Sequence, residues 1–255
     1  MGDNTKEIPL MNIKSTTVLL TAAIIVALPV NAHAMHITEG ILPFNWAVLW
    51  FAVAAPFVAL GLYKLKKDRT VGRIKPLLGM MAAAVFIVSC MPVPVPTAGT
   101  CSHPAGTAMA AILIGPVYSI LAAAVALLLQ ALFLAHGGLS TWGANIFSMG
   151  VIGSLAGFVV FKGLTKLNVS IVIAAFFAGV LGDWATYAAT SFELASALHG
   201  PGEFYRLFSA ILIAFVPTQL PLGILEGFMT AGAVKFLYGR RPELVGGLVR
   251  VKEGV

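Results

Sequence analysis

The fold class is decided by the stretch WAVLWFAVAAPFVALGLY, residues 46–63, which contains no charged residue. The segment KLKKDRTVGRIK, residues 64–75, follows at once and is strongly basic. An apolar segment of roughly 20 residues is what a helix needs to cross the hydrocarbon core of a bilayer. Loops rich in Lys and Arg flank such spans on the cytoplasmic side. Together the two segments predict a membrane span that ends in the cytoplasm.

The composition agrees with a membrane protein. Of the 255 residues, 59% are hydrophobic and 10% are charged, and the mean hydropathy is +0.94. Soluble domains carry about 25% charged residues. The pI of 9.5 does not indicate nucleic acid, because the basic residues lie in short clusters between apolar stretches. The expected partner of this surface is therefore the lipid bilayer, and we expect no nucleic acid.

The whole chain alternates apolar spans with short loops, which predicts an all-α integral membrane protein with about seven transmembrane helices. The segment 106–115 is the weakest of these spans, since its helix would rise only about 16 Å. It must either continue from the preceding residues or be re-entrant and shielded by protein. The remaining predicted spans are residues 76–91, 116–135, 143–161, 169–190 and 207–237.

The amino end is typical of a removable signal peptide over residues 1–34, with Met11 as an alternative start. A basic region precedes an apolar run, and Ala32-His33-Ala34 supplies a small-x-small cleavage site. An uncleaved signal anchor is the alternative. Cleavage leaves residues 35–255 as a single transmembrane metal-binding domain, with its amino terminus outside the cell and its basic carboxyl end in the cytoplasm.

Cleavage would place a histidine at position two of the mature chain. The amine of Met35, the amide nitrogen of His36 and the imidazole of His36 can then close a five-membered and a six-membered chelate ring on one ion. His103 lies on the same predicted outer face and can complete four nitrogens in a plane, which suits Ni(II), Cu(II) or low-spin Co(II). Because free imidazoles titrate near 6.5, the sequence predicts that binding weakens in mild acid.

Four motifs in order give this chain a family resemblance. It resembles the CbiM family, the substrate-binding (S) components of energy-coupling-factor cobalt transporters, whose nickel relatives are similar. The resemblance implies the S-component fold with an extra amino-terminal helix, and metal ligation by Met35, His36 and His103. The motifs are MHITEGILP (35–43), SHPAGT (102–107), HGGLSTWGAN (136–145) and PTQLPLGILEG (217–227).

The resemblance also implies a function and a set of partners. The chain would capture cobalt(II) as a transported substrate, without an organic cofactor, and supply it for cobalamin synthesis. A transmembrane coupling (T) subunit, two ATPase subunits and a small accessory membrane subunit would complete an ABC-type importer in the cell (inner or plasma) membrane. The chain contains no GxxxxGK[ST] phosphate-binding loop, so ATP hydrolysis must come from those partners.

Several other polar residues are candidates for supporting roles. Asn145, Ser102 and Thr100 are predicted to hydrogen-bond the ligands or their neighbouring backbone, although Asn145 could equally cap a helix. Asp183 and Glu226 lie within apolar spans, where we favour hydrogen bonding between helices over metal ligation.

The sequence leaves several alternatives open. The same chain could capture nickel(II), or it could be an intramembrane metalloenzyme that uses Glu39 beside His36 and His103. A metal-independent, vitamin-binding S component would leave the histidines idle. Cys90 and Cys101 could form a disulfide or stay separate.

Overall fold

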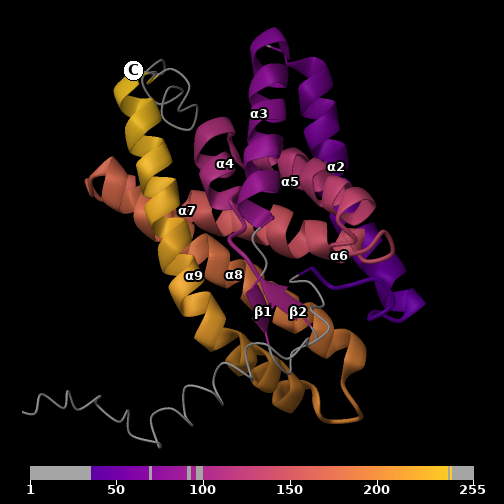
Figure 1. The fold of residues 1–255 in the computed structure, drawn as a ribbon. Coiled ribbons are helices and arrows are strands. Elements are labelled where there is room, and N and C mark those ends of the chain that lie inside the picture. The colour runs from indigo at the N-terminus through magenta and orange to yellow at the C-terminus, as the bar shows by residue number, and fades with distance from the viewer. Residues whose placement is uncertain (1–35, 69–70, 91–92, 96–99, 241, 243–255) are drawn as a thin grey trace, which may run out of the picture. The chain divides into compact units, whose positions relative to one another are not determined.

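The computed structural model describes residues 36–68, 71–90, 93–95, 100–240 and 242, and Figure 1 shows that they fold almost entirely as packed helices. The predicted signal peptide, residues 1–34, and Met35 lie outside the described residues. The helices are α2 (Phe44–Lys67), α3 (Val71–Ser89), α4 (Thr107–Ile114), α5 (Pro116–Phe133), α6 (Trp142–Asn145), the π-helix η1 (Ile146–Gly153), α7 (Ser154–Lys166), α8 (Ile171–Leu198) and α9 (Phe204–Arg240).

The all-α membrane class predicted from sequence is confirmed. Because α6, η1 and α7 continue one another over Trp142–Lys166, the described part of the chain has seven helical segments, one at each predicted span. Five of them are long and apolar enough to cross a bilayer. The 24 residues of α2, for example, rise about 36 Å, which exceeds a hydrocarbon core of about 30 Å.

The short helix α4 explains how the segment 106–115 is tolerated. Its eight residues are all buried, and α4 packs against α3, α5, α7, α8 and α9. A helix of this length rises only about 12 Å and could not cross a bilayer alone. The surrounding protein therefore shields α4 from lipid, which is one of the two alternatives that the sequence left open for this segment.

Two short strands interrupt the helical pattern between α3 and α4. Strand β1 (Val93–Val95) pairs antiparallel with β2 (Thr100–Ser102), so that Val93 lies opposite Ser102. Pro94 lies within β1, and proline lacks the backbone donor that the interior of a helix needs. The hairpin delivers the chain directly to His103, and in Figure 1 it lies closer to the turn between α8 and α9 than to the carboxyl end of α9.

Helices α8 and α9 lie alongside each other, as Figure 1 shows. A Cβ atom at Gly179 would come within 2.8 Å of the Glu226 carbonyl oxygen, so only glycine allows the two backbones to approach this closely. Helix α8 also runs to Leu198, beyond its predicted end at Thr190. The extension was missed because Ser191 and Glu193 reduce hydropathy, yet both are buried inside the protein rather than in a loop.

Candidate metal centre

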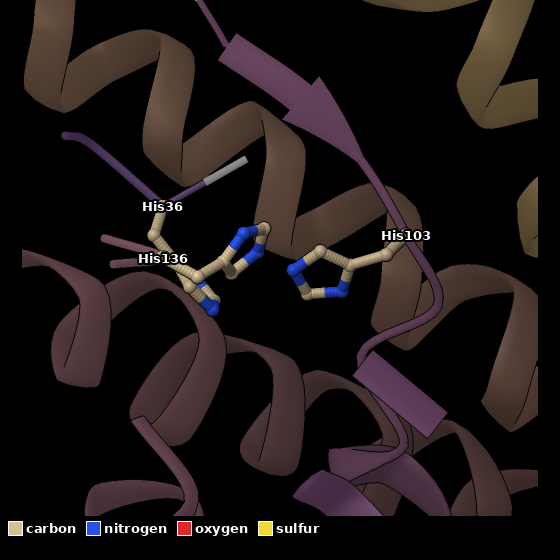
Figure 2. Close-up of side chains that lie close together, drawn as sticks. All are labelled: His36, His103 and His136. Atoms are coloured by element: carbon tan, nitrogen blue, oxygen red, sulfur yellow. The ribbon is translucent and has the colours of Figure 1, made fainter. Parts of the chain in front are cut away.

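Three histidines from distant parts of the chain converge at one buried point, and Figure 2 shows their imidazole rings facing one another. His36 precedes α2, His103 lies between β2 and α4, and His136 lies in the turn after α5. One nitrogen of each ring can be chosen so that all three lie within 4.8 Å of one another. With bonds of about 2.0–2.1 Å, two nitrogens on one ion are about 3 Å apart when adjacent and about 4 Å apart when opposite. The rings would therefore have to move closer together to bind one ion.

A buried hydrogen-bond chain orients the ring of His36. Its Nε2 lies 2.7 Å from Oε1 of Gln130, and Gln130 Nε2 donates to Ser89 Oγ over 2.7 Å. Ser89 Oγ in turn donates its single hydrogen to the Val85 carbonyl. Because Ser89 can only accept from Gln130, the amide must present its oxygen to His36. Nε2 of His36 then carries the proton, and Nδ1, the atom that closes a six-membered chelate ring, keeps its lone pair.

The segment that carries His36 is fixed by the 137–145 region. Asn145 accepts a hydrogen bond from the Ile37 amide over 2.8 Å and donates to the Ile37 carbonyl over 3.3 Å. Thr141 Oγ1 donates to the same carbonyl. Asn145 therefore contacts the backbone beside His36 rather than the imidazole itself, one of the two arrangements expected from sequence.

Helices α8 and α9 hold the segment that carries His103. The Tyr187 hydroxyl accepts from the His103 amide and donates to its carbonyl, over 3.1 and 3.0 Å. The Glu226 carboxylate accepts from the amides of Ala105 and Gly106, over 2.5 and 2.9 Å. The predicted inter-helix role of Glu226 thus takes the form of a bond from α9 to the loop before α4. The ring Nδ1 of His103 donates to the Pro104 carbonyl over 2.9 Å, which leaves Nε2 as the available lone pair.

His136 was not predicted as a ligand from the sequence. It lies in a tight turn in which Ala135 and Gly137 both have positive φ, +48° and +81°, and its amide donates to the Gln130 carbonyl over 3.2 Å. The sequence did contain an indication of this role, because His136 begins one of the four motifs and follows a predicted span on the outer side of the membrane. The sequence did not show how close the turn would come to His36.

Comparison with known proteins identifies the family. A family model described as "CbiM: Cobalt uptake substrate-specific transmembrane region" matches residues 36–244. The chain is 53% identical over 212 residues to the "Cobalt transport protein CbiM" of Sorangium cellulosum, covering 83% of this chain and 94% of that protein. The chain belongs to the CbiM family. The resemblance seen in the four motifs is thereby confirmed.

Other CbiM relatives and solved structures agree. The protein of the same name from Geobacter sulfurreducens is 62% identical over 215 residues, which cover 84% of this chain but only 62% of that longer protein. Two solved structures described as a transition metal transporter, one of them truncated, superpose with TM-scores of 0.70 and 0.72 at 26% identity. Each covers 80% of this chain, and the matches span 93% and 99% of those structures. The family is a transport component and not an enzyme, as predicted, so the metalloenzyme alternative is dropped.

The electrostatics of this CbiM site keep the histidines neutral. Burial lowers the pKa of His103 to about 3 and that of His136 to about 4, with the charge of His136 contributing further to the lowering at His103. Burial, followed by His103 and His136, lowers the pKa of His36 well below 6.5. Free imidazoles protonate in mild acid, whereas burial keeps these three neutral there in the folded protein. The predicted weakening of metal binding in mild acid stays a prediction. Desolvation disfavours the charged form, so lone pairs stay available for a metal.

The remaining sequence-predicted residues are placed as follows. Glu39 is exposed and accepts from the Ser140 amide over 3.1 Å, so it does not join the histidine cluster. Cys90 is a free thiol. The side chains of Thr100, Cys101 and Ser102 lie outside the described side chains.

Proposed function

We propose that this CbiM protein is the substrate-capture component of an ATP-driven cobalt(II) importer that supplies cobalt for cobalamin synthesis. The observation that carries the proposal is the convergence of His36, His103 and His136 at a buried point of a multi-pass membrane protein. Buried polar groups normally have partners, yet Nε2 of His103 has no hydrogen-bond partner among the described residues. A metal ion would satisfy it.

The ligand set follows from the chelate argument and the hydrogen bonds. The amine of Met35, the amide nitrogen and Nδ1 of His36, and Nε2 of His103 would form a nitrogen plane. Family members named as cobalt transport proteins support cobalt as the cargo. Nickel(II) remains the second candidate, because four nitrogens in a plane also suit that ion.

The orientation that we propose places this site outside the membrane and the carboxyl end of α9 in the cytoplasm. The basic segments 64–75, 162–168 and 235–252 support it. A passive site can only equilibrate with the outside solution. Net uptake would therefore require a transmembrane coupling subunit, two ATPase subunits and a small accessory membrane subunit.

The decisive experiment is elemental analysis of the purified mature protein together with its amino-terminal sequence. We expect Met35 as the first residue and about one cobalt or nickel ion per chain. His36→Ala and His103→Ala should each remove most of the metal, whereas His199→Ala should not, because His199 bonds its own helix at the Ala195 carbonyl. Functional protein that retains residues 11–34 would exclude the terminal chelate.

Reconstitution tests the partners. The chain alone in vesicles should bind cobalt without accumulating it, and ATP-dependent uptake should appear only when the coupling and ATPase subunits are added. ATP-driven accumulation by the isolated chain would exclude the role of a capture component.

A further inference from the structure

We propose that His136 binds the captured ion through Nε2 at a fifth, axial position, and that this bond favours cobalt(II) over nickel(II). The inference rests on the proposed function, because it concerns the same metal site. It adds a ligand that the chelate argument does not require and assigns to that ligand the choice between the two metals.

The first support is the environment of the His136 ring. Its Nε2 is buried and has no hydrogen-bond partner among the described residues. The ring centroid lies 4.9 Å from that of His36 and 5.2 Å from that of His103. A buried polar nitrogen without a partner costs free energy unless something binds it, and the cluster of nitrogens is where a metal would bind.

The second support is the backbone that places the ring. The turn after α5 adopts positive φ at Ala135, where a side chain other than glycine's is disfavoured. The amide of His136 is then fixed by the Gln130 carbonyl. Gln130 also bonds the ring of His36 through its side chain. One residue therefore fixes the positions of two histidines relative to each other.

The axial assignment follows from how each histidine is held. The amino terminus supplies three positions of the plane, so one histidine can complete the plane and the other must lie above it. His103 is fully buried, its ring is fixed through Pro104, and its backbone is held by Tyr187. The described structure shows no comparable bond to a ring nitrogen of His136. The rigid ring suits a short equatorial bond, and the freer ring suits a longer axial bond.

The electron count of each ion explains the preference for cobalt. Low-spin Ni(II) has eight d electrons in a nitrogen plane and fills the orbital that points along the axis, so it repels an axial donor. Low-spin Co(II) has seven, and that orbital holds one electron, so an axial nitrogen can bind. Geometry rather than raw affinity separates such metals in proteins.

Electron paramagnetic resonance of the cobalt-loaded, mature full chain tests the proposal directly. The unpaired electron of low-spin Co(II) lies along the axis, so one axial ¹⁴N nucleus should split each cobalt line into three. Histidine labelled with ¹⁵N should change three lines to two without altering the protein. His136→Ala should abolish the splitting, and His199→Ala should preserve it.

Metal titrations supply the second measurement. His136→Ala should weaken Co(II) binding about tenfold or more while Ni(II) binding changes by less than about threefold. A wild-type spectrum that is high-spin or lacks nitrogen splitting would overturn the proposal, as would splitting that survives in His136→Ala or equal losses for both ions. If wild-type protein bound neither metal, the proposed function itself would fail, and the two failures are thereby distinguished.

Discussion

Replacing Gly137 by alanine should push His36 out of the metal site. Gly137 has φ of +81°, and an added Cβ would lie 2.9 Å from the Cβ of His36 and 3.4 Å from its Cγ. The first distance is shorter than carbon atoms tolerate. Since the ring of His36 is hydrogen-bonded to Gln130, a shift that makes room for the new Cβ should disturb that bond.

The expected cost has two parts that act differently. Placing alanine in the left-handed region costs about 1–2 kcal/mol, which lowers the free energy of unfolding with or without metal. Overpacking against His36 costs about 1–3 kcal/mol. The metal-free protein can relieve this second cost by moving His36 aside, but metal binding brings it back. The Kd for cobalt should therefore rise about 5-fold to 150-fold.

Gly202→Ala is the matched control. Gly202 has φ of +77° in the turn between α8 and α9, and a Cβ there would meet nothing within 4 Å. It should show the same left-handed cost in thermal unfolding, with an unchanged Kd in a metal titration of the detergent-solubilised protein. If Gly137→Ala bound cobalt as tightly as Gly202→Ala does, the packing of this turn against His36 would not control the site.

Three further outcomes follow from the structure. An alanine inserted between Met35 and His36 would move the histidine to position three of the mature chain, where the terminus alone supplies four nitrogens. Cobalt uptake should then be lost. Normal uptake that still needs His103 would contradict the terminal chelate. Gln130→Leu removes the acceptor for Nε2 of His36 and should weaken cobalt binding about 10–100-fold, measured by competition with a chelator. An unchanged affinity for cobalt would show that the ring of His36 needs no orienting partner. In unfolded chains histidine titrates near 6.5, whereas the folded pKa values of His103 and His136 are about 3 and about 4. The unfolded state therefore binds more protons below pH 6.5 than the folded state does. The melting temperature of the metal-free protein should be highest above pH 6.5 and should fall steadily towards pH 4, less steeply in His103→Ala. A melting temperature that stays constant over that range would show that these rings are not buried and neutral.

The sequence alone determined the membrane class and the approximate position of each of the seven helical segments. Both depend on local composition, because about 20 apolar residues in a row have no other stable environment than a bilayer or a protein core. Segment 46–63 and its basic neighbour needed no tertiary information. The pairing of His36 with His103 could also be predicted, since the alternation of spans places both residues on one face.

Tertiary structure decided which side chains meet there and in what chemical state. His136 joins the cluster because a left-handed turn at Ala135 and Gly137 directs the chain back towards His36, and no local pattern encodes that approach. The choice of Nδ1 on His36 depends on Gln130, which is 94 positions away along the chain. Hydropathy fixes how deep a residue lies in the membrane, but the lateral packing of helices fixes its neighbours, and burial among those neighbours sets the protonation of the three rings.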